Sequence, residues 1–438
     1  MQLKYSYEGH KAYINASEID GGGVTSAKGF RANAVNAKIK PNSKKDDLAI
    51  VVCDNLAQTA LVATTNIFCA APIVVSRENL SHFGNASYGQ AKCVLINSGN
   101  ANAATGDPGI DNARRSAAAC ANLLDCAQSE VMVASTGVIG VSLPIEKIED
   151  NVEALVEGLH VNNSTKVARS IMTTDCIPKE YAISYESLDP RFAHQRFTVG
   201  GMAKGSGMIM PNMATMISVI TTDAPVPSAL AYEILHRVVS KTFNKVSVDS
   251  DTSTNDCCYL MSSASSKTAN NNNAGHMANS FKAEDVAAKE FEAALLAVCT
   301  HLARMIAKDG EGATKLITVN VTGAQSEECA DLAARAIANS PLVKTAIYGR
   351  DANWGRIVAA AGKSGAKFLQ ENVDVSIMGI EVCKSGLAQN FNEEHAAAKF
   401  EDQEIVIDVH LGAGSFSTTI WTCDFTHDYV TINGDYRT

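Results

Sequence analysis

A single threonine near the middle of the 438-residue chain stands where it could become a nucleophile. Thr215 lies in the stretch 204-KGSGMIMPNMATMISVITTDAP-225, where an ordinary strand threonine is the alternative interpretation. A threonine hydroxyl needs a base beside it, and no histidine occurs between His194 and His236. The free α-amino group of a chain-terminal threonine can be that base, because its unperturbed pKa is about 7.7–8.0. Such chemistry requires cleavage of the Ala214–Thr215 bond.

The glycine-rich piece 204-KGSG-207 before this threonine allows two interpretations. Glycines beside a lysine could hold a phosphate group. A P-loop, however, has its lysine after the glycines, and here Lys204 precedes them. A plain turn at the entry to a strand is the simpler interpretation.

The composition is that of a folded protein and excludes several classes of function. Hydrophobic residues make up 46% of the chain and charged residues 19%, and the length suggests two or three packed units. The formal charge is −10 and no run of lysines and arginines occurs, so no nucleic-acid partner is expected. No apolar run is long enough for a membrane span, and the start lacks the apolar core of a signal peptide. We therefore expect no membrane association and a cytoplasmic location.

Cysteine and histidine spacing gives no sign of a disulfide framework or a metal site. The twelve cysteines are scattered and form no CxxC pair, which is typical of reduced, buried thiols. The ten histidines are equally dispersed, with no HExxH motif. The sequence therefore predicts no metal.

Short apolar runs and longer alanine-rich segments alternate through the first half. Strands are predicted at 48–53, 91–97 and 130–136, where valine and isoleucine are frequent. The stretch 111–130 between two of them is alanine-rich and helix-like. This alternation predicts an α/β fold with a well-buried sheet.

The second half continues in the same style. Residues 316–323 alternate as a strand, and the polar stretch 262–280 predicts a surface excursion. An amphipathic helix is predicted over 287–308, and its apolar face comprises Phe291, Leu295, Val298, Leu302 and Met305.

The stretch around Thr215 also closely resembles a known family. PNMATM (211–216), with GGMAKGSGM (200–208) before it and TTDAP (221–225) after it, is similar to the self-cleaving segment of the ornithine acetyltransferases, the bifunctional glutamate N-acetyltransferases of arginine biosynthesis. The resemblance continues in order through GFRANAVNAKIK (29–40), FCAAPIVVSRENL (68–80), INSGNANAATG (96–106), ASTGVIG (134–140), MTTDCIPK (172–179), VDSDTSTND (248–256), DGEGATK (309–315), GRDANWGRIVAAAGKSG (349–365) and YVTINGDYRT (429–438).

This resemblance implies a catalytic set. Thr215 matches the family's nucleophile, which also binds substrate and is exposed when the precursor cuts itself between Ala214 and Thr215. Thr136 and Gly137 match the pair that forms the oxyanion hole, whose donors stabilise a tetrahedral intermediate. A turn that ends a strand is the alternative interpretation of this pair.

The resemblance also implies a substrate site with one group of each charge. Lys204 matches a substrate-site lysine and suits a carboxylate, whereas Glu311 matches the acidic residue that meets the substrate's ammonium. Without the resemblance, Lys204 would be interpreted as a solvated surface lysine. Glu311 would be a turn residue after a helix, because glycines flank it.

The resemblance implies three further residues that contact the substrate. Asn433 and Thr438 match a substrate-binding pair, although a final residue is more often frayed than functional. Thr173 matches another contact, but its neighbour Thr174 could occupy the same place. The motif 349–365 has no assigned role, and its polar residues are interpreted as ties within a turn.

The family likeness implies a fold, an assembly and a reaction. We expect a layered αββα sandwich like that of self-processing aminopeptidases, matured into an α chain (1–214) and a β chain (215–438) that associate as an α2β2 heterotetramer. N-acetylornithine would donate acetyl to Thr215, ornithine would leave, and glutamate would accept the acetyl group. No organic cofactor is needed, and acetyl-CoA would be a second donor only in a bifunctional enzyme.

Two alternatives stay open at this point. One is a self-processed amidohydrolase or aminopeptidase, in which water replaces glutamate as the acceptor. The other is an uncleaved amino-acid-binding protein that uses Lys204 and Glu311 but not Thr215.

Overall fold

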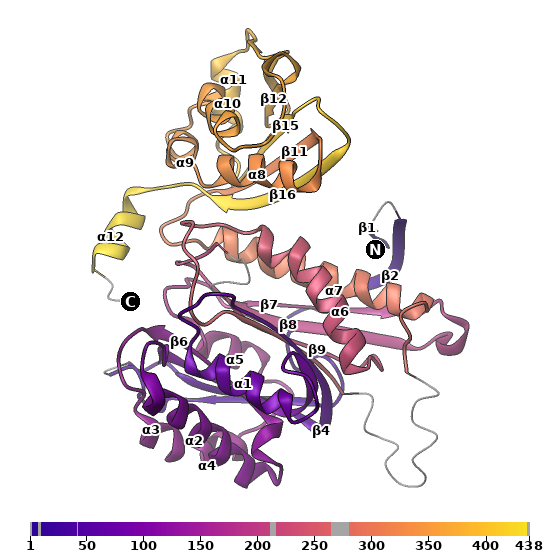
Figure 1. The fold of residues 1–438 in the computed structure, drawn as a ribbon, viewed down its shortest axis with the longest axis vertical. Helices are drawn as coiled ribbons and strands as arrows, with labels where there is room; N and C mark the ends of the chain where they lie inside the picture. The colour runs from indigo at the N-terminus through magenta and orange to yellow at the C-terminus, as the bar shows by residue number, and fades with distance from the viewer. Residues whose placement is uncertain (1, 8–9, 42, 211–215, 264–279, 436–438) are drawn as a thin grey trace.

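The computed structural model describes residues 2–7, 10–41, 43–210, 216–263 and 280–435 (Figure 1). A large part contains one extended sheet with helices on both of its sides, and a smaller lobe carries a second sheet. The strands of the large part are β1 (Gln2–Tyr7), β2 (His10–Glu18), β3 (Phe30–Val35), β4 (Leu48–Ala63), β5 (Tyr88–Asn100), β6 (Val131–Val138), β7 (Lys179–Glu186), β8 (Arg196–Lys204), β9 (Ile217–Thr222) and β10 (Cys257–Ser262). Its helices are α1 (Ala71–Ser81), α2 (Gly106–Leu124), α3 (Ile145–Glu149), α4 (Val152–Glu157), α5 (Ser164–Ser170), α6 (Ser228–Lys241) and α7 (Val286–Lys308).

The large sheet folds over itself because two long strands change partners along their length. The strand order is β1-β2-β7-β8-β9-β10-β4-β5-β6, with β3 beside β4. Residues 48–53 of β4 pair with β3, whereas residues 58–63 pair with β10. A break in register between Val52 and Ala57 separates the two halves. β4 and β5 therefore pass from one sheet layer into the next.

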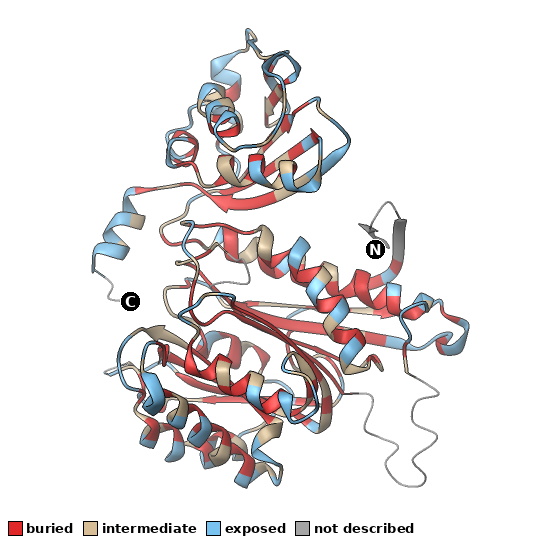
Figure 2. Cartoon of the chain, viewed as in Figure 1, coloured by how far each residue is buried: buried red, intermediate tan, exposed pale blue. Residues whose placement is uncertain are grey.

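Buried side chains show that these two sheet layers pack face to face between helices. Phe30, Val94 and Met132 of one layer share a core with Met202 and Tyr259 of the other. The outer face of the first layer packs on helices α1 to α4, and the outer face of the second packs on α6 and α7. Buried residues follow the strands in both layers (Figure 2). The predicted layered αββα sandwich is confirmed.

The elements predicted from sequence patterns are present. The runs at 48–53, 91–97 and 130–136 lie in β4, β5 and β6, and the alanine-rich stretch overlaps α2. In α7, four of the five predicted core residues are fully buried and Met305 is half-buried. Most of the polar stretch 262–280, namely residues 264–279, lies outside the described residues.

The predicted boundary between 1–214 and 215–438 falls inside one folded unit. β9 and β10, both from the second half, pair in parallel with each other. β9 also pairs with β8 from the first half, and β10 pairs with β4. Ala214 and Thr215 themselves lie outside the described residues, as does Thr438. A cut at this position would therefore leave both chains interlocked in the same sheets.

The smaller lobe is built on a second sheet of strand order β14-β13-β12-β15-β11-β16. A last helix, α12 (His427–Asp435), leaves this lobe and returns towards the large part (Figure 1). The remaining elements are β11 (Leu316–Ala324), β12 (Asp374–Ile377), β13 (Ile380–Lys384), β14 (Leu387–Ala388), β15 (Glu404–His410), β16 (Phe416–Cys423), α8 (Glu327–Ala338), α9 (Pro341–Tyr348), α10 (Trp354–Gly362) and α11 (Glu393–Lys399).

The polar residues of the motif 349–365 tie the start of α10 to its surroundings. The Asn353 side chain accepts a hydrogen bond from the backbone N–H of Arg356 and so caps the helix. Asn353 also donates to Asp351, and Arg356 donates to the carbonyl of Leu342. The interpretation of these residues as ties within a turn is confirmed.

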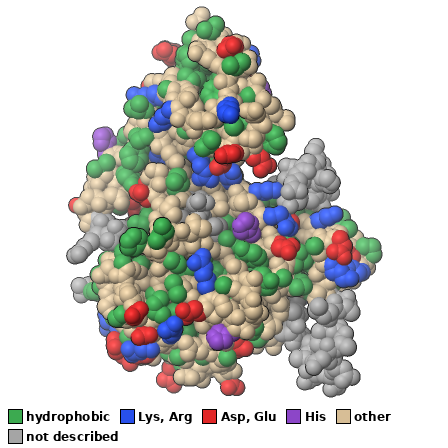
Figure 3. Space-filling model, in the orientation of Figure 1, with side chains coloured by type: hydrophobic (Ala, Val, Ile, Leu, Met, Phe, Trp, Pro, Cys, Tyr) green, Lys and Arg blue, Asp and Glu red, His purple; other side chains and the backbone are tan. Residues whose placement is uncertain are grey.

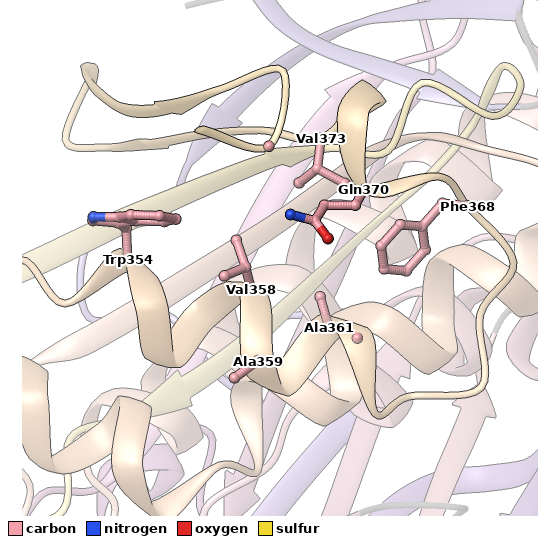
Figure 4. A pocket seen from close by; sticks show the side chains of 9 residues that line it. Trp354, Val358, Ala359, Ala361, Phe368, Gln370 and Val373 are labelled. Carbon is pink, nitrogen blue, oxygen red and sulfur yellow. The ribbon is translucent and has the colours of Figure 1, made fainter. Parts of the chain in front are cut away.

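The same helix borders an apolar cavity of about 340 Å³ in the smaller lobe (Figure 4). Trp354, Val358 and Phe368 line it, and Gln370 is a polar residue at its wall. None of its nine described lining residues is ionisable. Acid–base or nucleophilic chemistry therefore has no group to use there.

Charged side chains of both signs are mixed on the surface, and the cysteines are unpaired. Acidic and basic side chains are interspersed over the face shown in Figure 3. All twelve cysteines lie in described segments and are free thiols, and Cys176 alone is classed as exposed. Within the described ranges, no helix is long and apolar enough to cross a membrane. No cluster of three potential metal ligands occurs among the described residues.

Candidate active site

One cavity of about 200 Å³ gathers every predicted site residue that the structure describes. These residues come from the end of β6, the loop before β7, the end of β8, the turn after α7, and α12. The fold therefore joins positions that are almost 300 residues apart in the chain. The six residues are Thr136, Gly137, Thr173, Lys204, Glu311 and Asn433.

Thr136 and Gly137 lie where β6 ends beside β5. The two strands are parallel, and Gly137 is in register with Gly99. The φ angle of Gly137 is +131°, and a Cβ atom added to it would lie 2.3 Å from the carbonyl carbon of Gly99. Only glycine fits both the backbone conformation and the space. The end of β6 thus packs directly on the backbone of β5.

Lys204 is a buried lysine at the end of β8, with 5% of its surface exposed. Its ammonium donates to the Thr173 hydroxyl at 2.9 Å and to the Thr136 hydroxyl at 3.4 Å. Thr174 also lines the cavity, but it is Thr173 that Lys204 contacts. The interpretation of Lys204 as a solvated surface residue is wrong, because the strand carries it into the interior.

A network of buried charges surrounds Lys204. The Asp175 carboxylate lies 3.9 Å from its ammonium and accepts hydrogen bonds from Lys179 at 2.7 Å and from the Gly205 N–H at 2.7 Å. Lys179 in turn donates to Asp309 at 2.6 Å. Each buried charge therefore has a partner of opposite sign.

The pKa values of this network follow from burial and from these neighbours. Burial lowers the pKa of Lys204, and the nearby Lys179 lowers it further, while Asp175 opposes both. For Asp175, burial opposes ionisation, but Lys204 and Lys179 outweigh it and hold the pKa of the carboxyl well below its usual range. Asp175 is thus the fixed anion that favours a charged Lys204.

Glu311 provides the opposite charge in the same cavity. It is 7% exposed, and its carboxylate accepts a hydrogen bond of 2.7 Å from the Asn433 side chain on α12. Among the described residues, no lysine, arginine or histidine forms an ion pair with it. The carboxylate is therefore available to an ammonium group of a ligand.

The glycine-rich loop makes room for this carboxylate. A Cβ atom added to Gly207 would lie 2.3 Å from the Glu311 carboxylate. The backbone N–H of Glu311 donates to the Ser206 carbonyl at 3.1 Å, which fixes the distance between the two turns. Gly207 thus allows the close approach of Glu311.

We expect Gly207→Ala to weaken substrate binding selectively. The new methyl group must displace the Glu311 carboxylate, so the KM for an amino-acid substrate should rise about 10- to 100-fold, as for a lost hydrogen bond to a charged group. The matched control is Gly434→Ala beside Asn433, because a Cβ there meets no atom within 4 Å. Steady-state kinetics of both variants checks this. An unchanged KM in Gly207→Ala would mean that Glu311 does not touch the substrate.

Polar residues of the segment 248–256 were not predicted individually, although the resemblance included the segment. Asn255 donates to the carbonyls of Ala101 at 2.6 Å and Ser135 at 2.9 Å, which joins the ends of β5, β6 and β10. The Asp249 carboxylate accepts from the N–H groups of Met208 at 2.6 Å and Ile209. These side chains hold three loops around the cavity, and their density of Asp, Ser, Thr and Asn was the available signal.

Asp256 is the second group that sequence reasoning missed. Its carboxyl is buried, and no described residue donates a hydrogen bond of normal geometry to it, although the Met216 N–H lies near. Burial raises the pKa of Asp256 well above its usual range, although the Met216 N–H and the Lys204 ammonium oppose this. Asp256 directly precedes β10 as Met216 directly precedes β9, and these strands are in register from Cys257 and Ile217 onward. A buried acid thus lies next to the first described residue after Thr215.

Comparisons with known proteins identify the family of the chain. The model of the ArgJ family matches residues 31–438. The arginine biosynthesis bifunctional protein ArgJ of Chlorobaculum tepidum is 45% identical over 410 residues, which are 94% of this chain and 96% of the relative. The protein of the same name from Caldanaerobacter subterraneus is 44% identical over 428 residues, 96% of this chain and 100% of the relative. The crystal structure of Mycobacterium tuberculosis ornithine acetyltransferase complexed with ornithine is 34% identical and covers 45% of this chain and 99% of that chain, with a TM-score of 0.40.

Opposite charges in a small cavity suit an amino-acid ligand, and the relatives and the family model make the chain an acyltransferase. The family match over nearly the full length is more specific. The chain belongs to the ArgJ family, and the family resemblance found in the sequence is confirmed.

Proposed function

We propose that the chain cuts itself between Ala214 and Thr215, and that Thr215 then carries acetyl from N-acetylornithine to glutamate. The observation that carries the proposal is the convergence of Lys204 and Glu311 with Thr136 and Gly137 on one cavity. Relatives named as bifunctional proteins of arginine biosynthesis support acetyl transfer as the reaction.

The ends of the undescribed segment lie beside this cavity. The N–H of Met210 donates to the carbonyl of Asp251, a residue of the cavity wall. The carbonyl of Met216 accepts from the N–H of Cys257 at the start of β10. The residues on either side of the segment 211–215 are therefore held by backbone hydrogen bonds to Asp251 and Cys257, which supports a nucleophile close to this cavity.

The cleavage needs only the chain and one water molecule. The Thr215 hydroxyl attacks the Ala214 carbonyl, the acyl group moves from nitrogen to oxygen, and water hydrolyses the ester. The product is a free α-amino group on Thr215, which is the base that a threonine nucleophile requires. Thr136 and Gly137 would stabilise the tetrahedral oxyanion in this step and again in each acetyl transfer.

The transfer follows a two-step course through an ester. Thr215 attacks the acetyl carbonyl of N-acetylornithine, the amide bond breaks, and ornithine leaves with the proton from the hydroxyl. The amine of glutamate then attacks the acetyl-Thr215 ester and restores the hydroxyl. Lys204 would hold a substrate carboxylate and Glu311 an ammonium, with Thr173, Asn433 and Thr438 as further contacts. Both substrates can use one site because they are amino acids that bind in turn.

This mechanism needs no organic cofactor, and acetyl-CoA would serve as a second acetyl donor. The α chain (1–214) and β chain (215–438) would stay together, since β9 and β10 of the second lie between β8 and β4 of the first in one sheet. An α2β2 heterotetramer in the cytoplasm is the expected form. Two alternatives differ in the product. A hydrolase would release free acetate, whereas an uncleaved binding protein would bind amino acids without turnover.

The mass of the purified, denatured protein tests the proposal first. We expect two fragments, the second beginning Thr-Met-Ile-Ser, and neither at 46.3 kDa. Incubation with N-acetylornithine alone should then add the mass of one acetyl group to the second fragment, and glutamate should remove it. A single 46.3 kDa chain that binds amino acids without transferring acetyl would contradict the proposal.

A further inference from the structure

A buried lysine of the smaller lobe has no role in the steps described so far. Lys344 lies on α9 and is 3% exposed. Val343 and Ile347 of the same helix pack into the core of the smaller lobe. Lys344 instead contacts Val248 of the large part and Thr422 near the end of β16, where the chain turns towards α12 (Figure 1). α9 therefore connects the core of the smaller lobe with the junction between the two parts.

Neutral groups hold the Lys344 ammonium at this junction. It donates to the carbonyl of Val248 at 2.7 Å and to the Thr422 hydroxyl at 2.9 Å, and the Cys423 sulfur lies 3.7 Å away. Within the described ranges, no carboxylate forms an ion pair with it. A buried charge costs free energy unless hydrogen bonds compensate it, and a methionine of similar length would fill the space without that cost. The groups that the ammonium holds therefore explain its presence better than packing does.

One of these groups leads into the wall of the substrate cavity. The Val248 carbonyl accepts from Lys344, and the Val248 N–H donates to the Ile209 carbonyl at 2.6 Å. The next residue, Asp249, lines the cavity and accepts a hydrogen bond from the N–H of Met208 at 2.6 Å. Lys344 thus fixes the backbone that carries Asp249.

The other contacts of Lys344 lead to α12, which has no buried residue of its own. The Phe425 N–H, just before this helix, donates to the Lys344 carbonyl at 3.4 Å, and the Phe425 ring lies 5.9 Å from the Lys344 ammonium. The same ring packs on Tyr429 of α12, with the ring centroids 4.5 Å apart. Tyr429 and Asn433 line the substrate cavity, and Asn433 donates to the Glu311 carboxylate at 2.7 Å. Because α12 has no core to hold it, contacts at its start determine where these two side chains lie.

We propose that Lys344 is a positioning residue for the Glu311 end of the substrate cavity. It does not line that cavity, and it acts through Val248 on one wall and through Phe425 on α12. The inference rests on the proposed function, because Glu311 and Asn433 must meet the substrate. It assigns part of the affinity for the amino acid to a residue of the smaller lobe.

Lys344→Met should weaken the binding of ornithine and leave the chemical step almost unchanged. The loss of hydrogen bonds from a charged group should raise the Kd of ornithine, measured by calorimetry on the mature enzyme, about tenfold. The KM for N-acetylornithine should rise by a similar factor, whereas kcat should stay within about twofold of wild type, as for a contact made equally in the ground state and the transition state. The control is Lys363→Met, which removes an exposed lysine of the same lobe.

Phe425→Leu tests the same link and leaves the buried charge in place. It deletes the ring that contacts both Lys344 and Tyr429, so the Kd of ornithine should rise about threefold. This variant keeps the test possible if Lys344→Met does not fold. In addition, Lys344→Met should raise the Kd less in an Asn433→Ala background than in wild type, because both changes act on the same contact.

The outcomes separate this inference from the proposed function. A Lys344→Met protein with a lower Tm but an unchanged Kd for ornithine would overturn the inference, because the lysine would then only stabilise the fold. Losses in Lys344→Met and Asn433→Ala that multiply in the double variant would also overturn it. A wild-type enzyme that binds ornithine but is neither cut nor transfers acetyl would contradict the proposed function alone. A wild-type enzyme that does not bind ornithine would overturn both.

Discussion

Thr215→Ala should remain one chain of 46.3 kDa and should lose acetyl transfer almost completely. The variant lacks the hydroxyl that attacks the Ala214 carbonyl, so neither the new α-amino group nor the nucleophile forms. The loss in kcat should approach about 10⁶-fold, the scale seen when a nucleophile is removed from an enzyme that works through a covalent intermediate. Intact mass and an assay with N-acetylornithine and glutamate measure the two effects on the same sample.

Thr215→Ser is the matched control for this prediction. Serine keeps the hydroxyl and removes only a methyl group, so the chain should still be cut and should still transfer acetyl at a reduced rate. A Thr215→Ala protein that is nevertheless cut would show that another group attacks the peptide bond. An uncut Thr215→Ala protein with wild-type transfer would place the nucleophile elsewhere. The two readouts thus test the processing and the catalytic role of the same hydroxyl separately.

The sequence predicted the sheet layers and helices of the fold, but it did not predict the long strands that run from one sheet layer into the other. The apolar run 48–53 predicts a six-residue strand, but β4 continues to Ala63 and joins both sheet layers. The polar residues Asp54 and Asn55 interrupt the apolar pattern at the point where the register shifts. The spacing of apolar residues shows which face of a strand is buried, but it does not show which strands pair with it. It therefore cannot show that a strand changes partners along its length.

The site was predicted by resemblance and not by residue patterns. On pattern alone Lys204 was a surface residue and Glu311 a turn residue, yet both are buried. The burial of Lys204 depends on Asp175, Lys179 and Asp309, which lie 25 to 105 positions away. Such partners carry no periodic signal, because their spacing is set by the crossing of strands and loops in the folded chain.

We expect the second large loss of activity in Gly137→Ala, which changes the predicted oxyanion hole. The added Cβ atom would lie 2.3 Å from the backbone carbon of Gly99 and 2.6 Å from the backbone nitrogen of Asn100. These backbone atoms cannot rotate away as a side chain could, so the strand end must shift. A donor that moves away from the oxyanion costs about 10²- to 10³-fold in kcat. Self-cleavage should slow as well, since it passes through the same kind of tetrahedral intermediate.

Gly140→Ala separates displacement of the donor from general backbone strain. Gly140 lies three residues after Gly137, just beyond the end of β6, with a φ angle of +76°, and a Cβ atom there meets nothing within 4 Å. That variant should lose about 1–2 kcal/mol of folding free energy from the positive φ angle but keep cleavage and transfer. Intact mass over time, thermal unfolding and kcat for both variants make the comparison. If the two variants lose kcat equally, strain in the loop explains the effect, and the Gly137 N–H is not an oxyanion donor. If Gly137→Ala alone loses kcat and cleavage together, one backbone position serves both reactions.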